Sequence, residues 1–210
     1  AIVINFDHSA DHMSKAYELF FHNGPLAILP MKKHKNNLFS STVIWTEKKD
    51  LIDSLNKLEH NFLLKILEEK IFKFVGRIEK IKDVQSFNLS AHINSTFFEE
   101  RVVYVGDSAH SIHPIAGQGW NVGVRDVQKC INVIDKSLLL GLDIGSFSVC
   151  KKYNDETYYD AYSLFEITDK LNTVFANDNF LVAAIRKKGF KIINNKKFLK
   201  NFITDFAMGT

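Results

Sequence analysis

The sequence is poor in proline and cysteine and has no long apolar run. Its 210 residues include 3 prolines, 2 cysteines and 10 glycines, which excludes collagen-like, proline-rich and low-complexity chains. Cys130 and Cys150 fit neither a disulfide framework nor a CxxC pattern, so we expect reduced thiols in an intracellular protein. No apolar run approaches the roughly 20 residues that a membrane-spanning helix needs.

An excess of charge of one sign is also missing. The 27 basic and 24 acidic residues leave a net charge of +3, which is too small to indicate nucleic acid as a partner. With 46% hydrophobic and 24% charged residues, the composition is that of a folded globular protein. The length allows one large domain or two small ones.

The first third of the chain indicates an antiparallel sheet. The chain has no initiator methionine and begins inside a β-branched pattern, so we expect it to be part of a longer protein. Strands are predicted at 2–7, 25–31 and 39–46, with a polar hairpin loop at 32–37.

A helix is predicted next, with Thr46 as its N-cap and Glu47 in its first turn. Gly76 interrupts the helical pattern. The apolar residues at helical spacing, which we expect to form its packed face, are Leu51, Leu55, Leu58, Phe62 and Ile66.

The rest of the chain alternates strand and helix before becoming helical. Strands are predicted at 85–91 and 101–106, the second buried on both faces, and helices at 146–170, 180–188 and 196–206. A further helix after Gly119 ends at Gly141, with Val127, Ile131, Ile134 and Leu138 on one face. We expect an α+β or α/β fold in three parts, 1–82, 83–141 and 142–210.

The stretch 101–126, RVVYVGDSAHSIHPIAGQGWNVGVRD, carries the chemistry. Gly106 ends a strand where the backbone must turn or something must approach closely. Asp107 then lies at the carboxyl end of that strand, the edge where open α/β sheets bind ligands, and can accept hydrogen bonds from ligand hydroxyls. Pro114 stiffens the loop, and Gly117-Gln118-Gly119 opens a helix whose free N–H groups suit an anionic or electron-rich atom.

The string GDSAHSIHPIAGQGWNVGVRD resembles the second flavin-binding motif of the class A flavoprotein aromatic hydroxylases, which have a para-hydroxybenzoate hydroxylase-like fold. Its HP-x-AGQG-x-N-x-G form is most similar to the ubiquinone-biosynthesis hydroxylase family. GPLAILPM, the strand ending in Trp45-Thr46, and Ala207-Met208-Gly209 extend the resemblance over essentially all 210 residues, as the second half of a family member. It implies a substrate-domain sheet, return strands of an FAD domain and C-terminal helices.

The resemblance also implies roles for individual residues. Gly106 and Asp107 would meet the ribityl hydroxyls of FAD, and Pro114 would lie near the isoalloxazine face. The backbone of Gly117, Gln118 and Gly119 and the helix start near Asn121 would face the pyrimidine edge of the ring. NAD(P)H would reduce the flavin, and O2 would form a C4a-hydroperoxide that hydroxylates a polyprenylated phenol in ubiquinone biosynthesis.

The sequence departs from the family pattern in two places. The GxGxxG fingerprint that holds the ADP half of FAD does not occur in it, so we expect the isolated chain to bind FAD poorly and to be inactive. Tyr153 is followed four residues later by Thr157 where the family tends to place an Arg. Two alternatives stay open: a hydroxylase of a small aromatic acid, and a non-catalytic product of a truncated or split gene that acts as a binding module.

The other candidate residues are weaker. His110 and His113 lack further ligands at a spacing that would bind a metal, and Ser108 lacks the GxSxG context of a hydrolase nucleophile. Arg125 and Asp126 read as surface or loop-anchoring residues, and no catalytic base is assigned.

Between Arg186 and Lys200 the sequence has seven basic residues and no acidic one, interleaved with apolar residues. This pattern fits a solvated helix face or a peripheral contact with anionic lipid. We expect a cytoplasmic protein, peripheral at the inner membrane, that associates with other ubiquinone-biosynthesis proteins.

Overall fold

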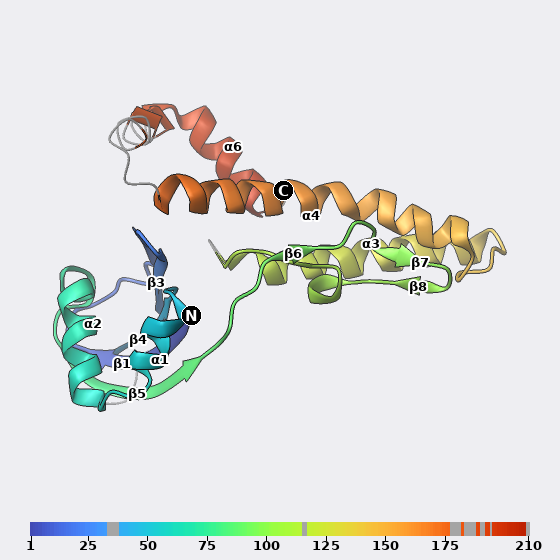
Figure 1. Ribbon diagram of the computed structural model, residues 1–210. Helices are drawn as coiled ribbons and strands as arrows, with labels where there is room; N and C mark the ends of the chain where they lie inside the picture. Colours follow the sequence, from blue (N-terminus) through green and yellow to red (C-terminus); the bar gives the residue numbers. More distant parts are fainter. Residues whose placement is uncertain are drawn as a thin grey trace. The chain divides into compact units, whose positions relative to one another are not determined.

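The computed structural model describes residues 1–32, 38–114, 117–176, 182, 188–189, 192–193 and 195–208. They form two compact units, Ala1–Leu89 and Ser90–Thr210 (Figure 1). The predicted mixed fold with an antiparallel sheet is confirmed. The finer division into three parts at 82 and 141 stays a proposal.

The first unit is built on a five-stranded antiparallel sheet with the strand order β2-β3-β4-β1-β5. The strands are β1 (Ile2–His8), β2 (Tyr17–Phe21), β3 (Gly24–Pro30), β4 (Phe39–Trp45) and β5 (Ile78–Ser86). Ile4 pairs with Val43 across β1 and β4, and both side chains are fully buried. Three of these strands match the predicted ones.

Two strands escaped the sequence pattern. Strand β2 was not predicted, and β5 begins well before the predicted strand at 85–91. Only Ile78 and Ile81 of β5 are buried, and charged residues occupy most of its other positions, as suits a strand at the edge of the sheet. That charge hides the two-residue period on which strand prediction relies.

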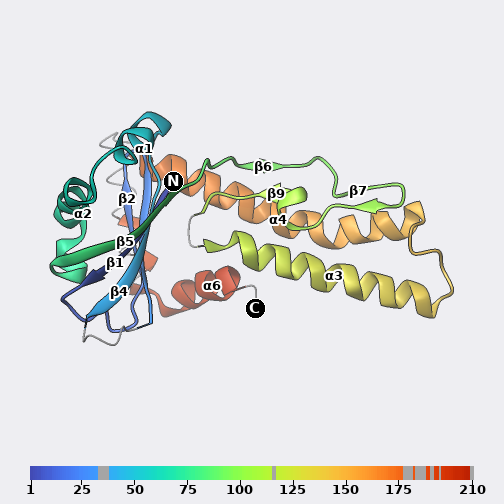
Figure 2. The same ribbon diagram turned by 90° about the horizontal axis from the view of Figure 1, so that it is seen from below.

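Two helices cover one face of this sheet (Figure 2). They are α1 (Lys49–Leu55) and α2 (His60–Val75), where the sequence predicted one helix. The N-cap of α1 is Lys48 and makes no side-chain cap hydrogen bond, so the predicted cap at Thr46 is wrong. Gly76 ends α2 with a φ of 68°, as predicted.

The predicted apolar face of this helical region is also mostly wrong. Leu51, Leu58 and Phe62 are exposed, and the break between the helices resets the phase of the second one. The residues of α1 and α2 that pack on the sheet are Ile52, Leu55, Leu63, Leu67, Ile71 and Val75.

The second unit combines short strand pairs with long helices. Its elements are β6 (His92–Ile93), β7 (Phe98–Glu99), β8 (Val102–Val103), the 3-10 helix η1 (Gly106–Ser108), β9 (His110–Ser111), α3 (Gly119–Leu139), α4 (Phe147–Ala176) and α6 (Lys197–Met208). The predicted strand at 101–106 is shorter than expected and is not buried on both faces: Val102 is exposed. Among the described residues β8 pairs with β7 alone, so one of its edges stays open.

Helix α3 begins at Gly119 as predicted, but its orientation differs from the prediction. Val127, Ile131 and Leu138, which were expected to pack, are exposed. The buried residues of α3 are Val122, Asp126, Val133 and Ser137. Hydrophobic spacing therefore identified the helix correctly and assigned the wrong face to the interior.

The C-terminal helices agree with the sequence where the structure describes them. Helix α4 begins one residue after the start of the predicted 146–170 and runs on to Ala176, and α6 likewise begins one residue after the start of the predicted 196–206. The helix predicted at 180–188 lies almost entirely outside the described residues. Asp160 of α4 joins the two long helices by accepting hydrogen bonds from Arg125 (2.9 Å) and Lys129 (3.0 Å) of α3. Within the described part of the chain, no helix is both long and apolar enough to cross a membrane.

Candidate functional site

The turn that follows β8 is the centre of the candidate site. Gly106 has a φ of 58°, a conformation that favours glycine. The Ser108 hydroxyl accepts a hydrogen bond from the Val105 N–H (3.0 Å) and donates one to the Val105 carbonyl (2.8 Å). The side-chain amide of Asn94 donates to the Ser108 carbonyl (2.9 Å). These bonds define a tight turn that leads the chain away from the strand.

The turn lies directly against α3. A Cβ atom added to Gly123 would be 3.5 Å from the Cα of Gly106, so the two glycines let the strand end and the helix come close. Asp126, one turn further along α3, accepts a hydrogen bond from the Gly106 N–H (3.1 Å). The interpretation of Asp126 as a loop-anchoring residue is therefore supported by its contacts.

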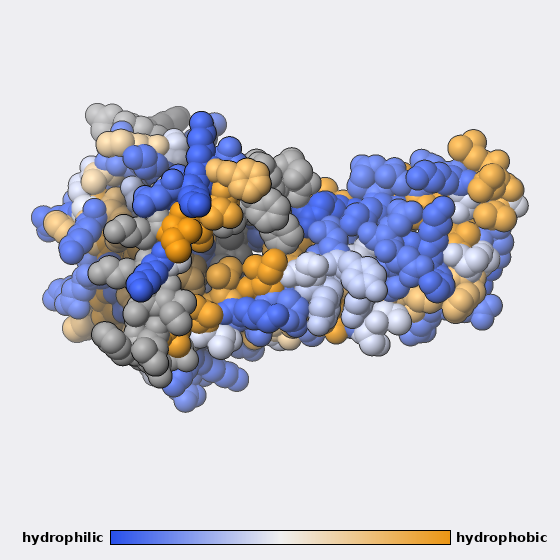
Figure 3. Space-filling model, turned by 90° about the horizontal axis from the view of Figure 1, so that it is seen from above, coloured by the Kyte–Doolittle hydropathy of each residue, from blue (hydrophilic) through white to orange (hydrophobic). Residues whose placement is uncertain are grey.

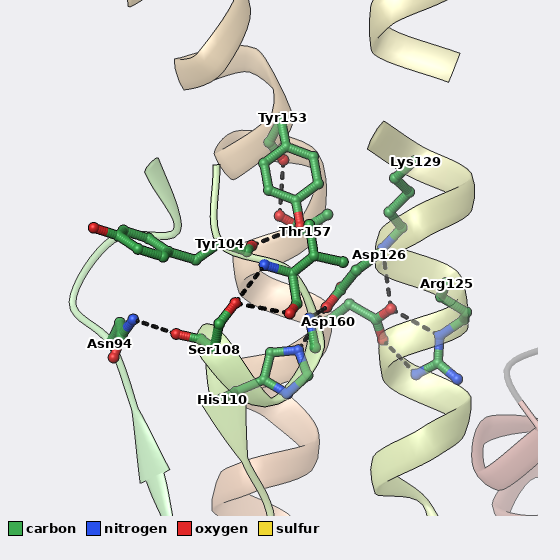
Figure 4. A network of polar contacts seen from close by, with 12 residues as sticks. Asn94, Tyr104, Ser108, His110, Arg125, Asp126, Lys129, Tyr153, Thr157 and Asp160 are labelled. Atoms are coloured by element: carbon green, nitrogen blue, oxygen red, sulfur yellow. Dashed lines mark hydrogen bonds and ion pairs between the residues drawn. The ribbon is translucent and has the colours of Figure 1, made fainter. Parts of the chain in front are cut away.

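His110 completes this anchor. Its Nε2 lies 2.6 Å from Oδ2 of Asp126, and Figure 4 shows the two side chains pointing toward each other between the loop and α3. Arg125, the neighbour of Asp126, instead forms an ion pair with Asp160 of α4. The sequence did not reveal the His110–Asp126 contact. The sequence feature that could have predicted this contact is the acidic residue at 126, which falls on the same side of the helix as Val122 and Val133.

Asp107 is placed differently from Asp126. Its carboxylate is exposed at the tip of the turn and has no hydrogen-bonding partner among the described residues. A carboxylate without a protein donor is free to accept hydrogen bonds from ligand hydroxyls.

The start of α3 carries a partial positive charge, opposite in sign to the carboxylate of Asp107. Gln118 is its N-cap and makes no side-chain cap hydrogen bond, so the first N–H groups of the helix are available to a ligand. Gly117 has a φ of 61°, and no atom of the described residues lies within 4 Å of the Cβ position that it lacks. Asn121 is exposed, Pro114 is half-buried, and Ile115 and Ala116 lie outside the described residues.

Tyr153 supports the strand end from the α4 side. Its hydroxyl donates to the Tyr104 carbonyl (2.9 Å), and burial raises the pKa of its phenol. Thr157, at the position where the family tends to have Arg, is buried and donates its hydroxyl hydrogen to the Tyr153 carbonyl (2.8 Å). Both residues act here on backbone geometry.

His113 lies further along the same loop and is half-buried. Burial lowers the pKa of its imidazole, which favours the neutral ring. In the described ranges no group of three His, Cys, Asp or Glu side chains could hold a metal ion.

A glycine turn with a free carboxylate, held against the uncapped start of a helix, is how mixed α/β proteins bind nucleotide and flavin cofactors. The fold and the site together therefore define a cofactor-binding protein of this class. The profile of the FAD binding domain family matches residues 2–137, and the chain belongs to that family.

Relatives of known name agree with this assignment. The chain is 33% identical over its whole length to the ubiquinone hydroxylase UbiL of Rhodospirillum rubrum, covering 48% of that protein. It is 24% identical to the mitochondrial ubiquinone biosynthesis monooxygenase COQ6 of Schizosaccharomyces pombe, over 90% of this chain and 46% of that protein. The predicted resemblance to class A hydroxylases is thus confirmed, and the chain spans about half the length of these relatives.

A solved structure shows the same fold. The crystal structure of p-nitrophenol 4-monooxygenase PnpA from Pseudomonas putida DLL-E4 matches 99% of this chain with a TM-score of 0.69 and 15% identity, covering 53% of that protein.

The residues of this site fit the flavin half of FAD, the cofactor of the family. The cradle at Gly117 is open, the helix N–H groups are uncapped, and the carboxylate of Asp107 is available for ribityl hydroxyls. The GxGxxG unit that would bind the ADP half does not occur in these 210 residues.

Proposed function

We propose that the protein containing this chain is an FAD-dependent monooxygenase that hydroxylates the ring of a polyprenylated phenol in ubiquinone biosynthesis. Similarity along the whole chain to proteins named as ubiquinone hydroxylases supports the reaction and the pathway. The observation that carries the proposal is the free carboxylate of Asp107 on a turn anchored beside the uncapped start of α3.

The proposed roles are those that the family resemblance implies, and the geometry of the turn and the helix start supports them. Asp107 accepts hydrogen bonds from the ribityl hydroxyls, and Gly106 leaves room for the approach. The backbone of Gly117, Gln118 and Gly119 and the helix start near Asn121 face the pyrimidine edge, where the positive end of the helix stabilises negative charge on the reduced ring. Pro114 lies near the isoalloxazine face. FAD supplies oxygen activation, with electrons from NAD(P)H.

The substrate would bind on the sheet of the first unit. Strand alternation directs one set of side chains toward α1 and α2, and the other set to the opposite face. Residues that alternate with the core positions, such as Ala27, Leu29 and Ile44 in the strands β3 and β4, are half-buried and apolar. The same face also carries the hydrogen-bonded polar pair Asn5 and Thr42. Its apolar part suits the prenyl chain of a prenylated phenol better than a small charged acid.

The segment from Arg186 to Lys200, rich in basic residues, adds a contact with the membrane surface to the proposal. Phe198 at the start of α6 is 80% exposed among Lys196, Lys197 and Lys200, as expected for a helix that lies on anionic lipid. Replacing the three lysines by Glu is expected to reduce sedimentation with anionic vesicles. Unchanged sedimentation would assign the segment to a solvated face. Association with other ubiquinone-biosynthesis proteins is part of the same proposal.

Flavin binding is the first test. The protein expressed from its own gene is expected to carry near-stoichiometric FAD, and the 210-residue chain to bind it more weakly. Trp120, the second residue of α3, is 79% exposed and its fluorescence should be quenched by bound FAD, whereas Trp45 is buried in the sheet unit. Trp120→Phe should remove most of the quenching. Absence of flavin from the gene product would overturn the proposal.

Substrate choice is the second test. With NAD(P)H and O2, product formation is expected from a polyprenylated phenol and not from 4-hydroxybenzoate. Leu29→Asp should raise the KM for the prenylated compound, because it places a charge on the apolar face. Phe62→Asp, at an exposed position on α2, is the matched control. Preference for the small acid would favour the alternative hydroxylase.

A further inference from the structure

We propose that the buried His110–Asp126 pair is a positioning device, which fixes the distance between the two parts of the flavin site. This inference rests on the proposed function, because the ligands that it positions are those of the flavin. Neither residue is assigned to contact the cofactor.

Both side chains are removed from water: His110 is 1% exposed and Asp126 is 0% exposed. A buried carboxylate is costly unless donors compensate it. A single oxygen of Asp126, Oδ2, takes both available donors, the Gly106 N–H at 3.1 Å and the His110 Nε2 at 2.6 Å. The pair is therefore part of a built arrangement in which backbone and imidazole share one acceptor.

The carboxylate form of Asp126 only accepts hydrogen bonds. In that form Nε2 of His110 carries the hydrogen and donates it to Oδ2, the same atom that accepts from the Gly106 N–H. A hydrogen bond to an ionised acceptor is about twice as strong as a neutral one. The pair therefore holds the amide of Gly106 more firmly than an ordinary backbone contact would.

The position of that amide gives the pair its role. Gly106 directly precedes Asp107, which is proposed to accept the ribityl hydroxyls, while Asp126 lies seven residues, about 10 Å, along α3 from its first residue, Gly119. The two contacts to Asp126 therefore tie the turn to the helix that faces the pyrimidine edge. If these contacts are lost, the Asp107 turn and the start of α3 can each still form, but the distance between them is no longer fixed.

The imidazole cannot readily swing away from this position. The ring of His110 packs against Phe97, with ring centroids 5.5 Å apart, and Phe97 packs in turn against Tyr158 of α4 at 5.2 Å. The Phe97 N–H donates to the Asn154 side chain of α4 (2.8 Å). The loop that carries His110, helix α3 and, through Phe97, helix α4 thus all hold the pair in place. A group that positions others needs such surrounding contacts.

The test uses the protein expressed from its own gene and three substitutions. His110→Phe keeps the ring and removes the donor, Asp126→Asn keeps the size and the acceptor oxygen and removes the charge, and His110→Gln restores an N–H donor in place of Nε2. Asp160→Asn is the matched control, since Asp160 also pairs with α3 but does not touch the turn. If His110→Phe fails to fold, Asp126→Asn and His110→Gln keep the test decisive.

The expected readout is graded. His110→Phe should weaken FAD binding about tenfold, Asp126→Asn about threefold, and His110→Gln should bind within about twofold of the unsubstituted protein. In the weakened variants the midpoint potential of the bound flavin should become more negative, because the helix N–H groups no longer align with the ring. Hydrogen exchange at the Gly106 amide, measured without FAD, should be faster in the same order.

Three outcomes overturn the inference in distinguishable ways. Faster exchange at Gly106 with unchanged FAD affinity and potential would show that the pair stabilises the loop without positioning the flavin. No FAD binding by the unsubstituted protein would overturn the proposed function together with this inference. An effect of Asp160→Asn equal to that of His110→Phe would attribute the change to general loosening of α3.

Discussion

Two helices of this chain, α2 and α3, use their apolar residues in opposite ways. Helix α2 buries Leu63, Leu67, Ile71 and Val75 against the sheet of the first unit. Helix α3 exposes most of its apolar stripe while burying Asp126 and Ser137. Hydrophobic residues also gather at the right-hand end in Figure 3, where α3 passes to α4. Burial of apolar area orients α2, and contacts to the glycine turn orient α3.

The two buried histidines show the same contrast. In the first unit, His8 has partners for both ring nitrogens, the Val75 carbonyl (3.1 Å) and the Ser41 hydroxyl (2.9 Å). In the second unit, Nδ1 of His110 and Oδ1 of Asp126 have no partner among the described residues. The polar groups of His8 serve packing within the sheet unit, whereas those of His110 and Asp126 concentrate on one backbone amide beside the proposed cofactor site.

The largest expected effect comes from truncating the two helices at matched positions. Leu67→Ala removes a fully buried side chain and should lower the free energy of unfolding by about 2–5 kcal/mol. Val127→Ala, on the 48% exposed stripe of α3, should cost less than about 0.5 kcal/mol in the 210-residue chain. Urea unfolding followed by circular dichroism measures both, and equal losses would contradict the comparison.

Two glycines of like conformation separate backbone strain from cofactor binding. Gly117 and Gly141 have φ values of 61° and 68°, and in the part of the chain that the structure describes neither has an atom within 4 Å of its missing Cβ. Alanine at either position should destabilise the fold by about 1–2 kcal/mol. Only Gly117→Ala should also weaken FAD binding, as measured by fluorescence titration. Equal FAD affinity in both variants would remove Gly117 from the cofactor site.

The ion pair between α3 and α4 should matter less. Burial raises the pKa of Asp160, but hydrogen bonds from Arg125 and Lys129 outweigh it and bring the pKa below its usual value. The stabilisation is therefore present above the unfolded-state pKa, about 3.9, and is lost as pH falls through the folded-state value. At neutral pH, Asp160→Asn should cost less than about 1 kcal/mol, and the loss should shrink at high salt. A loss that does not respond to salt would argue against an ion pair.

The smallest expected effect is a pH dependence of the sheet unit. Burial lowers the pKa of His8, against opposing contributions that include its hydrogen bond to Val75. The unfolded chain then binds the proton more readily, so stability falls as pH drops below about 6.5. Trp45 fluorescence in a Trp120→Phe background reports on this unit. His8→Gln should flatten the dependence, and an unchanged slope would assign it to another titratable group of the sheet unit.

Local patterns were enough to predict much of the fold. β-Branched and apolar residues along β1, β3 and β4 identified the sheet, because such side chains favour strands. The glycines at 76 and 141 marked helix ends, since their positive φ angles suit few other residues. The motif at 106–121 also predicted a turn followed by a helix start, which the structure contains.

The errors arose where a decision depended on partners distant in the sequence. The break between α1 and α2 follows from how Ile52 and Leu63 each reach the same sheet, which helical spacing does not encode. Edge strand β5 was hidden by its charges. The exposed stripe of α3 was assigned to the interior because an apolar face looks the same in a sequence whether or not anything packs on it.

The amino-acid sequence by itself determined the kinds of element, their order and the glycine–aspartate turn, because φ preferences and hydrophobic periods act within a few residues of each other. Only the tertiary structure decided which face of α3 is buried and that His110 meets Asp126, sixteen residues away. Those outcomes depend on the close approach of Gly106 to Gly123 and on the desolvation of a carboxylate, which exist only once the turn and the helix are packed together.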